Sequence, residues 1–162
     1  MTNPVPRLDF SIRLAAASDI VDLSALMEEF YAGSGYPLDR SWAEASLLRL
    51  ISRPDWGCIW IARSGREAVG HAVLSVRYTM ERGGLSGYID DLFVRMTFRR
   101  QGVGRALLNE LFVECRKRGC AAGQVEVAHD NTAALGLYAA FGLWPHRDGR
   151  QLLAGPILDI RA

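Results

Sequence analysis

The sequence predicts an α/β (α+β) domain in which about four helices flank a central mixed, mostly antiparallel sheet of about six or seven strands. Two observations predict this class. Apolar segments joined by a hairpin turn occupy the middle of the chain, and a strand–helix–strand unit follows later. No internal repeat, low-complexity tract or Pro/Gly/Ser-rich linker divides the chain, so residues 1–162 are expected to form one domain.

The first third of the chain predicts one strand and two helices. Apolar and polar side chains alternate over residues 10–14, as in a strand. A Ser-Asp pair opens residues 18–33, where apolar positions recur at helical spacing as far as a glycine. Ser41 and Glu44 form a capping box that opens a second helix, which Pro54 ends.

The middle of the chain predicts three strands. Residues 57–63 and 68–78 are rich in Ile, Val and aromatic residues, and residues 64–67 between them are typical of a hairpin turn. A loop containing Gly83 and Gly84 separates them from a further strand over residues 88–94.

The last third predicts two helices and three strands. Helices are expected over residues 103–118 and 131–141, each closed by a glycine. A strand over residues 124–128 lies between them. Two more strands are expected, around Leu143 and over residues 152–160, where a proline favours an edge or bulged strand.

The composition is that of an ordinary soluble globular protein and excludes several classes of function. The chain is 49% hydrophobic and 23% charged, and its 19 basic and 18 acidic residues leave a formal charge of +1. This balance gives no reason to expect a nucleic acid or a membrane surface as a partner. The apolar runs are too short to span a bilayer and no signal-peptide pattern opens the chain, so a cytoplasmic protein is expected.

The cysteines and histidines predict neither disulfides nor a metal site. The cysteines contain no CxxC pair and are expected to be reduced thiols, and the histidines are far apart without a ligand pattern such as HExxH. The residues concerned are Cys58, Cys115, Cys120, His71, His129 and His146.

The most informative segment lies between a predicted strand and a predicted helix. Gly102 and Gly104 have no side chains, so a ligand can approach the backbone at the helix N-terminus, where free amides and the helix dipole favour an anion. Arg99, Arg100 and Arg105 surround this turn, which therefore suits a phosphate or pyrophosphate. A dinucleotide fingerprint is disfavoured because its third glycine is replaced by leucine, and a Walker A lysine is absent. The glycines could also serve only to make a tight turn.

Two carboxylates interrupt the apolar strand before this turn. Neighbouring residues of a regular strand face opposite sides, so at least one of Asp90 and Asp91 should point towards the interior or a cleft. Burying an unpaired carboxylate costs several kcal/mol, which a purely structural strand has little reason to bear. The alternative is that both residues lie at the rim or pair with arginines.

A third segment, residues 131–143, is a helix with small residues on several sides. Tyr138 follows Asn131 by seven residues, about two helical turns, so both can address one ligand. Taken alone, Tyr138 could equally be an ordinary half-buried tyrosine.

Together and in this order, the three segments resemble the GNAT superfamily of N-acetyltransferases. Residues 99–104 look like its pyrophosphate loop, Arg/Gln-x-x-Gly-x-Gly/Ala, and residues 131–142 look like its motif Asn-x-x-Ala-x-x-x-Tyr-x-x-x-Gly. The match covers residues 88–143 well. The strand over residues 88–94 is most similar to the diamine (spermidine/spermine) acetyltransferase branch. The chain departs from the pattern in having Asp90 where that branch usually carries Glu, and Arg100 where many members have glycine.

The resemblance implies a site for acetyl-CoA as co-substrate. The pyrophosphate would lie on the turn, the pantetheine arm would pair like a strand with the backbone of the acidic strand, and residues of the last helix would contact pantetheine. The residues implied are Arg99, Arg100, Gln101, Gly102, Val103, Gly104 and Arg105; Leu92, Phe93 and Val94; and Asn131 and Ala134.

The resemblance also implies direct attack of a primary amine on the thioester, with Tyr138 protonating the leaving thiolate. That proton transfer is uphill by about 2 kcal/mol from ordinary pKa values, whereas transfer from an alkylammonium to an ordinary aspartate is uphill by about 9 kcal/mol. Asp90 and Asp91 are therefore interpreted as a cation anchor first and, for Asp90, a water-mediated base second. Glu28 and Tyr36, with Glu29, Tyr31 and Asp39, could form a negative, aromatic-walled entrance. The alternative for the two glutamates is a solvated helix face.

The function expected is acetyl transfer from acetyl-CoA to a small-molecule amine, either a polyamine or an amino-acid-like compound. The alternatives are a protein or peptide N-acetyltransferase and a non-catalytic acyl-CoA-binding module. The resemblance also allows a homodimer.

Overall fold

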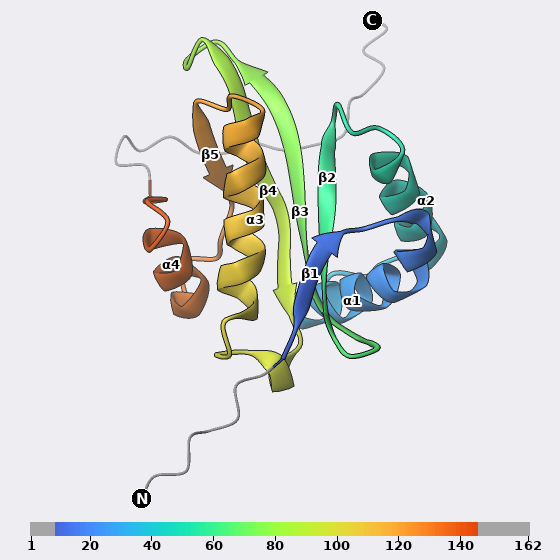
Figure 1. The fold of residues 1–162 in the computed structure, drawn as a ribbon. Helices are drawn as coiled ribbons and strands as arrows, with labels where there is room; N and C mark the ends of the chain where they lie inside the picture. Colours follow the sequence, from blue (N-terminus) through green and yellow to red (C-terminus); the bar gives the residue numbers. More distant parts are fainter. Residues whose placement is uncertain (1–8, 146–162) are drawn as a thin grey trace, which may run out of the picture. The chain divides into compact units, whose positions relative to one another are not determined.

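The computed structural model describes residues 9–145, and the chain divides into two compact units, residues 1–128 and 129–162. The first unit contains a five-stranded sheet of order β1-β2-β3-β4-β5 (Figure 1). Neighbouring strands are antiparallel except for the parallel pair β4–β5, so the sheet is mixed and mostly antiparallel, as predicted. The strands are Ser11–Leu14 (β1), Gly57–Ser64 (β2), Glu67–Thr79 (β3), Gly84–Val94 (β4) and Ala122–Val125 (β5).

Some strand boundaries differ from the prediction. β4 begins at Gly84, because residues expected in a loop continue the pairing with β3. β5 ends at Val125 rather than three residues later. Residues 143–145 form no strand, and the strand expected over residues 152–160 lies outside the described residues.

The described residues contain the four predicted helices, in the predicted order. Two short 3-10 turns, Ala17–Asp19 (η1) and Met96–Phe98 (η2), follow β1 and β4. None of the helices in this part of the chain is long and apolar enough to cross a membrane. The helices are Ile20–Gly33 (α1), Arg40–Ile51 (α2), Val103–Lys117 (α3) and Thr132–Ala139 (α4).

The N-terminus of α2 differs from the predicted capping box. Asp39 is the N-cap residue, and its carboxylate accepts a hydrogen bond of 3.0 Å from the Trp42 amide. Ser41 donates to the same carboxylate, while Glu44 accepts from the Arg40 guanidinium. Aspartate caps a helix as well as serine does, and Asp39 comes first along the chain.

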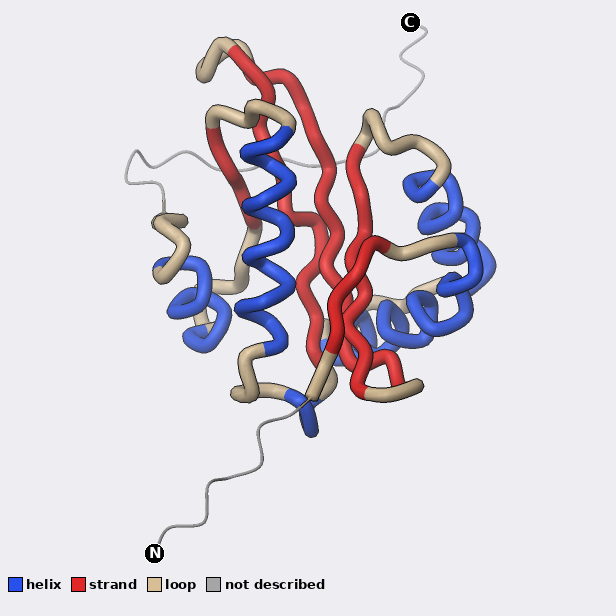
Figure 2. Tube along the Cα trace, in the orientation of Figure 1, coloured by secondary structure: helices blue, strands red, loops and turns tan. Residues whose placement is uncertain are grey.

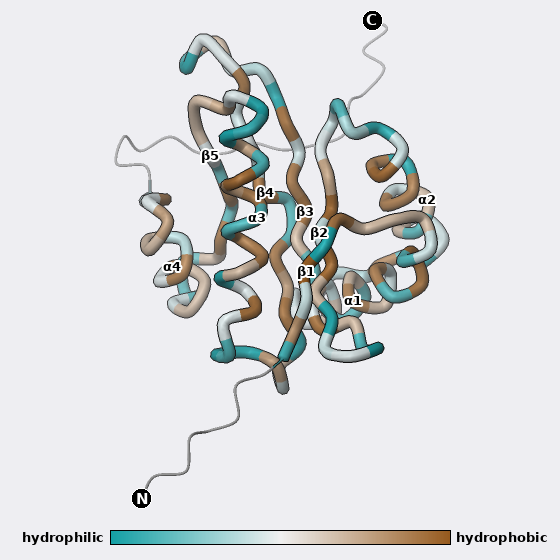
Figure 3. The backbone as a smooth tube through the Cα atoms, in the orientation of Figure 1, coloured by the Kyte–Doolittle hydropathy of each residue, from teal (hydrophilic) through white to brown (hydrophobic). Residues whose placement is uncertain are grey.

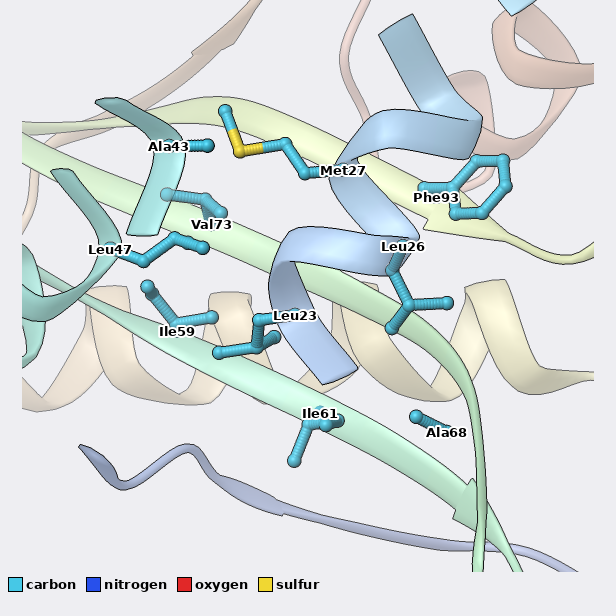
Figure 4. Packing of buried hydrophobic residues seen from close by; sticks show 10 residues of the cluster. All are labelled: Leu23, Leu26, Met27, Ala43, Leu47, Ile59, Ile61, Ala68, Val73 and Phe93. Atoms are coloured by element: carbon cyan, nitrogen blue, oxygen red, sulfur yellow. The ribbon is translucent and has the colours of Figure 1, made fainter. Parts of the chain in front are cut away.

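Helices cover both faces of the sheet in the first unit. α1 and α2 pack on one face and α3 packs on the other (Figures 1 and 2). The central strands are hydrophobic along most of their length (Figure 3). Buried side chains of α1, α2 and the sheet form the core shown in Figure 4: Leu23, Leu26, Met27, Ala43, Leu47, Ile59, Ile61, Ala68, Val73 and Phe93.

The first turns of α3 are fixed to the sheet. Val103, Leu107, Leu108 and Leu111 are almost completely buried, and full burial of such side chains contributes about 1.5–3 kcal/mol each. Further along, α3 approaches β4 so closely that a Cβ at Gly87 would lie 2.4 Å from a cysteine sulfur of the helix. The start of α3, which follows the glycine turn, is therefore held in place by packing.

Candidate functional site

A β-bulge in β4 places the two carboxylates. Asp91 lies opposite Val73 of β3, and Ile89 lies opposite Leu74, so Asp90 is an extra residue with no partner in β3. The strict alternation assumed from the sequence is therefore interrupted between Asp90 and Asp91. Asp91 is buried, as expected for at least one of the pair, whereas Asp90 is exposed.

Both carboxylates lie near side chains from one face of β3 and from α1. The Asp91 Oδ2 atom is 3.7 Å from Nε2 of His71, and Asp90 hydrogen-bonds with Ser75, four residues further along β3. Burial raises the pKa of Tyr31 of α1, and the charges of Asp91 and Asp90 raise it further. The bulge thus directs two adjacent acids towards the side of the sheet that α1 covers.

Desolvation raises the pKa of Asp90 above its ordinary value. The charges of Asp91 and Glu126 raise it further, whereas the Ser75 hydrogen bond and the charge of Arg77 lower it. Glu126 follows β5 and accepts a hydrogen bond from the Tyr88 hydroxyl. This end of β4 is therefore an acidic region in which a positively charged ligand would relieve repulsion.

One edge of β4 is open beyond the bulge. β5 pairs with β4 only over Ser86–Ile89, so residues 91–94 have a strand partner in β3 alone and Asp90 has none. Within this segment Leu92 and Val94 are half-buried and Phe93 is buried. Such an edge can accept an extended ligand, as the strand-like pairing of pantetheine requires.

The turn after β4 is held by its own side chains. Arg99 Nε donates to the Val94 carbonyl at 2.8 Å, and Gln101 Nε2 donates to the Thr97 carbonyl at 2.9 Å. The Arg99 guanidinium also lies over the Phe93 ring, 5.9 Å from its centre. Both side chains therefore fix the path of the turn, a function that sequence reasoning did not assign to them.

Left-handed backbone conformations lead the turn into α3. Gly102 is the N-cap of α3 with φ +91°, and no atom lies within 4 Å of where its Cβ would be. Arg100 also has a positive φ, 62°, at the position where many family members have glycine. The first bond within the helix runs from the Ala106 amide to the Gly102 carbonyl, so the amides of Val103 and Gly104 precede the helical ladder. We call these amides and the open space at Gly102 the glycine cradle, because such a helix N-terminus has the geometry that favours an anion.

The acidic residues of α1 are paired with arginines. Arg40 lies 3.5 Å from Glu28, and Arg95 binds Glu29 at 2.7 Å. Tyr36 is exposed in the loop after α1, and Asp39 caps α2. Of the acidic, aromatic entrance predicted from the sequence, Tyr31 is therefore the residue that the structure brings next to Asp90 and Asp91.

The second unit contains the remaining predicted residues. The Asn131 side chain is the N-cap of α4 and accepts a hydrogen bond of 3.1 Å from the Ala134 amide. Tyr138 is the buried residue of this helix. The predicted contacts of these three residues with coenzyme A and the thiolate stay predictions.

Sequence reasoning missed His71. It was considered only as a metal ligand, and the absence of a ligand pattern left it without a role. The alternation of β3 could have identified it, because His71 shares a strand face with the buried Val73, which belongs to the core cluster. A polar residue on a core face of a strand requires an explanation.

Comparisons with known proteins agree with the fold. Residues 22–143 match the model of the acetyltransferase (GNAT) family. The [ribosomal protein bS18]-alanine N-acetyltransferase of Escherichia coli K12 is 40% identical over 72 residues, covering 37% of this chain and 49% of that enzyme. The chain thus spans about half the length of the curated relatives it matches.

Two solved structures extend the likeness over most of the chain. The integron cassette protein HFX_CASS3 from the mobile metagenome of Cole Harbour Salt Marsh has a TM-score of 0.79 and 35% identity, covering 91% of this chain and 90% of that one. AAC(6')-Iy, solved with the bisubstrate analogue CoA-S-monomethyl-acetylneamine, has a TM-score of 0.74, covering 93% of this chain and 99% of its own. At 19% identity, the second likeness shows the fold alone.

Proposed function

Because this chain belongs to the acetyltransferase (GNAT) family, whose co-substrate is acetyl-CoA, we propose that it transfers an acetyl group from acetyl-CoA to a primary amine. We propose a small-molecule acceptor, either a polyamine or an amino-acid-like amine. The observation that carries the proposal is that three features follow one another along the chain from β4 to the start of α3. They are the acidic bulge, the open edge of β4 and the glycine cradle of α3.

The cradle supports a donor site at the start of α3. The open space at Gly102 allows a diphosphate to approach the amides of the first helical turn, and Arg99, Arg100 and Arg105 add positive charge around it. In this proposal, pantetheine lies along Leu92–Val94 and brings the thioester towards the carboxylates. Bound acetyl-CoA supplies an activated acyl group whose leaving group is a thiolate.

The acidic bulge supports a cationic acceptor. Asp90 and Asp91 have no lysine or arginine ion-pair partner among residues 9–145, so a substrate ammonium can supply the missing charge. The raised pKa of Asp90 also narrows the gap of about 9 kcal/mol that separates an alkylammonium from an ordinary carboxyl group. Asp90 is accordingly proposed as a cation anchor and a water-mediated base.

In the acetyl transfer itself, the protein group that acts on the leaving thiolate is proposed to be Tyr138. The neutral amine attacks the carbonyl carbon, and the Tyr138 hydroxyl protonates the departing thiolate, at a cost of about 2 kcal/mol from ordinary pKa values. A Tyr138→Phe variant should bind acetyl-CoA with unchanged affinity and lose at least about 100-fold in turnover, measured by thiol release. Unchanged turnover would remove Tyr138 from the proposed mechanism.

The donor site can be tested with a matched pair of glycines at the two ends of α3. Gly102 and Gly119 both have positive φ, and neither has an atom within 4 Å of its absent Cβ. Alanine should therefore strain the backbone equally at both positions. By calorimetry, Gly102→Ala should weaken coenzyme A binding at least tenfold, whereas Gly119→Ala should change it less than twofold. Equal losses, or no binding by the wild-type protein, would contradict the donor site.

A peptide α-amine is the second candidate acceptor. It is favoured by the 40% identity to an enzyme named as a ribosomal-protein-alanine N-acetyltransferase. Thiol release should be compared across spermidine, lysine, an aminoglycoside and a short peptide with an N-terminal alanine. We expect the free amines to be used with the higher kcat/KM. Activity confined to the peptide would select the second candidate, and coenzyme A binding without any turnover would indicate a non-catalytic module.

Three further expectations belong to the proposal. The diamine acetyltransferase branch is the proposed closest branch, although the curated relative reported above is of another kind. A single GNAT domain over residues 1–162 and a cytoplasmic homodimer also stay predictions.

A further inference from the structure

His71 is a polar side chain with no hydrogen bond in the core of the first unit. It is 0% exposed, and neither ring nitrogen has a hydrogen-bond partner among the described residues. Phe30 of α1 and Phe93 of β4 flank the ring, with centres 6.5 Å and 6.1 Å away. Buried nitrogens are rarely left without partners, because they lose their hydrogen bonds to water. The position of this imidazole therefore calls for a functional explanation.

The ring faces one of the two carboxylates of the bulge. Nε2 lies 3.7 Å from Oδ2 of Asp91, less than 1 Å beyond an ordinary N–H···O distance. Tyr31 of α1 and Asp90 of β4 are titratable groups that interact with this acidic site, and the register partner of His71 in β2 is the apolar Ile61. Asp91 is thus the group through which His71 can reach the acidic site.

We infer that His71 and Asp91 form a buried dyad that accepts the proton which the acceptor ammonium must lose before it attacks. The inference rests on the proposed function. An N–H bond of the ammonium breaks, and its proton passes through the Asp91 carboxylate to Nε2, which leaves a neutral amine and an imidazolium paired with Asp91. After acetyl transfer, the imidazolium returns this proton to solvent through Asp91.

The remaining protons also balance. When the amine nitrogen bonds to the carbonyl carbon, the carbon–sulfur bond breaks and the thiolate takes the Tyr138 proton. The new amide nitrogen loses its second proton, which restores the Tyr138 hydroxyl. The net products are the amide, the free thiol and one proton released to solvent.

This assignment separates the roles of the two aspartates: Asp90 keeps the role of cation anchor, and the dyad takes the role of base in place of Asp90. An ordinary imidazole binds a proton about 400-fold more tightly than an ordinary carboxylate, so it is a better acceptor for an ammonium proton. Asp90, exposed on the bulge, would hold the cation, while Asp91 connects that cation to His71. His71 acts through Asp91 and is a positioning and proton-holding residue without contact to the substrate.

The kinetic test compares His71→Gln with the wild-type protein. Glutamine has an amide that can donate to Asp91 but cannot hold a proton near neutral pH, so a merely structural role would be rescued. At pH 7, with the best amine of the panel, kcat/KM should fall about 30- to 100-fold, with KM for acetyl-CoA unchanged. The wild-type-to-variant ratio should shrink as the pH rises towards the pKa of the amine, because a neutral amine needs no acceptor for its proton. A ratio that is independent of pH, or full activity of the variant, would overturn the inference.

A second test needs no turnover and therefore separates this inference from the proposed function. The ¹⁵N ring signals of His71 can be assigned by their absence in His71→Gln, with His129 as an internal reference. In the ligand-free protein, Asp91→Asn should move the His71 signals, whereas the matched variant Asp90→Asn should leave them in place. Signals that do not respond to Asp91→Asn would exclude the dyad even in an active enzyme. If the wild-type protein releases no thiol with any amine, the proposed function fails. The response of the His71 ¹⁵N signals to Asp91→Asn then decides by itself whether the dyad exists.

Discussion

Two acidic clusters of the first unit are built in opposite ways. Asp19, just before α1, is 2% exposed and accepts hydrogen bonds from Arg13 at 2.7 Å, from Arg63 at 3.0 Å and from the Ala16 amide at 2.9 Å. Asp90 and Asp91 have no lysine or arginine ion-pair partner in the described part of the chain.

The pKa shifts follow this difference. The Arg13 hydrogen bonds lower the pKa of Asp19 strongly, against the opposing effect of burial, while desolvation raises the pKa of Asp90. A carboxylate that stabilises the fold is supplied with cations by the chain itself. A carboxylate that lacks them carries a desolvation cost that a bound cation can offset, which is the property expected of a ligand site.

Replacing one aspartate of each cluster with asparagine removes its charge and keeps its shape. The two variants should differ in their effects on activity and on the free energy of unfolding. We expect Asp91→Asn to lower kcat/KM about 100-fold, equivalent to about 2.7 kcal/mol, because in the inferred dyad this carboxylate carries the proton. Asp19→Asn should leave kcat/KM of the folded protein within twofold. Thiol-release assays well below the Tm of each variant measure both. The contrast breaks down if the two variants lose activity equally.

The same pair should reverse its order in a stability measurement. Asp19→Asn should lower the free energy of unfolding by about 2–3 kcal/mol, since charge-assisted hydrogen bonds from two arginines are weakened in a buried position. For a protein of this size the Tm should fall by about 4–12 °C. Asp91→Asn should cost less, because it also removes repulsion from Asp90. Urea or thermal unfolding of the three proteins checks the order, and a larger loss in Asp91→Asn would refute it.

Acidification should affect the two clusters with opposite sign. The folded pKa of Asp19 lies below its unfolded value of about 3.9, so its contribution is present above about pH 4 and is lost as the pH falls towards the folded pKa. The folded pKa of Asp90 is raised, so its ionisation destabilises the fold as the pH rises through that value.

Urea titrations between pH 3 and pH 7 can resolve these signs. The stability difference between wild type and Asp19→Asn should be largest at pH 7 and should narrow below pH 4. Asp90→Asn should be slightly more stable than wild type at pH 7, by about 0.5 kcal/mol or less after solvent screening, and this gain should disappear at low pH. A gain from Asp90→Asn that grew on acidification would contradict the raised pKa.

The smallest expected effect concerns two arginines, one in each kind of environment. Arg63 bonds Asp19 and Asp22, whereas Arg100 is exposed with φ 62° on the turn before α3. Arg100→Gly should relieve about 1 kcal/mol of left-handed strain and raise the Tm, while weakening coenzyme A binding about two- to fivefold through the lost charge. Calorimetry and thermal unfolding report the two effects separately. Arg100→Ala is the control, because it removes the charge and keeps the strain.

Features encoded locally could be predicted from the sequence. The order of strands and helices follows from hydrophobic periodicity, and the turn at Gly102 follows from glycines at a strand–helix junction. The bulge at Asp90 could not be predicted, because it depends on the register between β3 and β4. That register depends on the length of the turn between the two strands, which the sequence pattern does not define.

Long-range partners account for the other differences. Glu28 and Glu29 were candidates for an acidic entrance or a solvated helix face, and the structure pairs them with arginines, Arg40 from α2 and Arg95 from the turn after β4. His71 was recognisable only by its strand face, and its proximity to Asp91 requires two paired strands. Sequence patterns therefore identified the candidate donor turn better than the acidic region of β4.

Asp90, the unpaired residue of β4, belongs to the candidate site but is not needed for the pairing of the sheet. If Asp90 were deleted, Ile89 and Asp91 would become neighbours opposite Leu74 and Val73, and the ladder with β3 would run without interruption. The parallel pairs with β5 all lie before this point and would keep their register. Asp90 thus has the geometry of a one-residue insertion into an otherwise continuous ladder, so the pairing of β3 with β4 does not depend on its side chain.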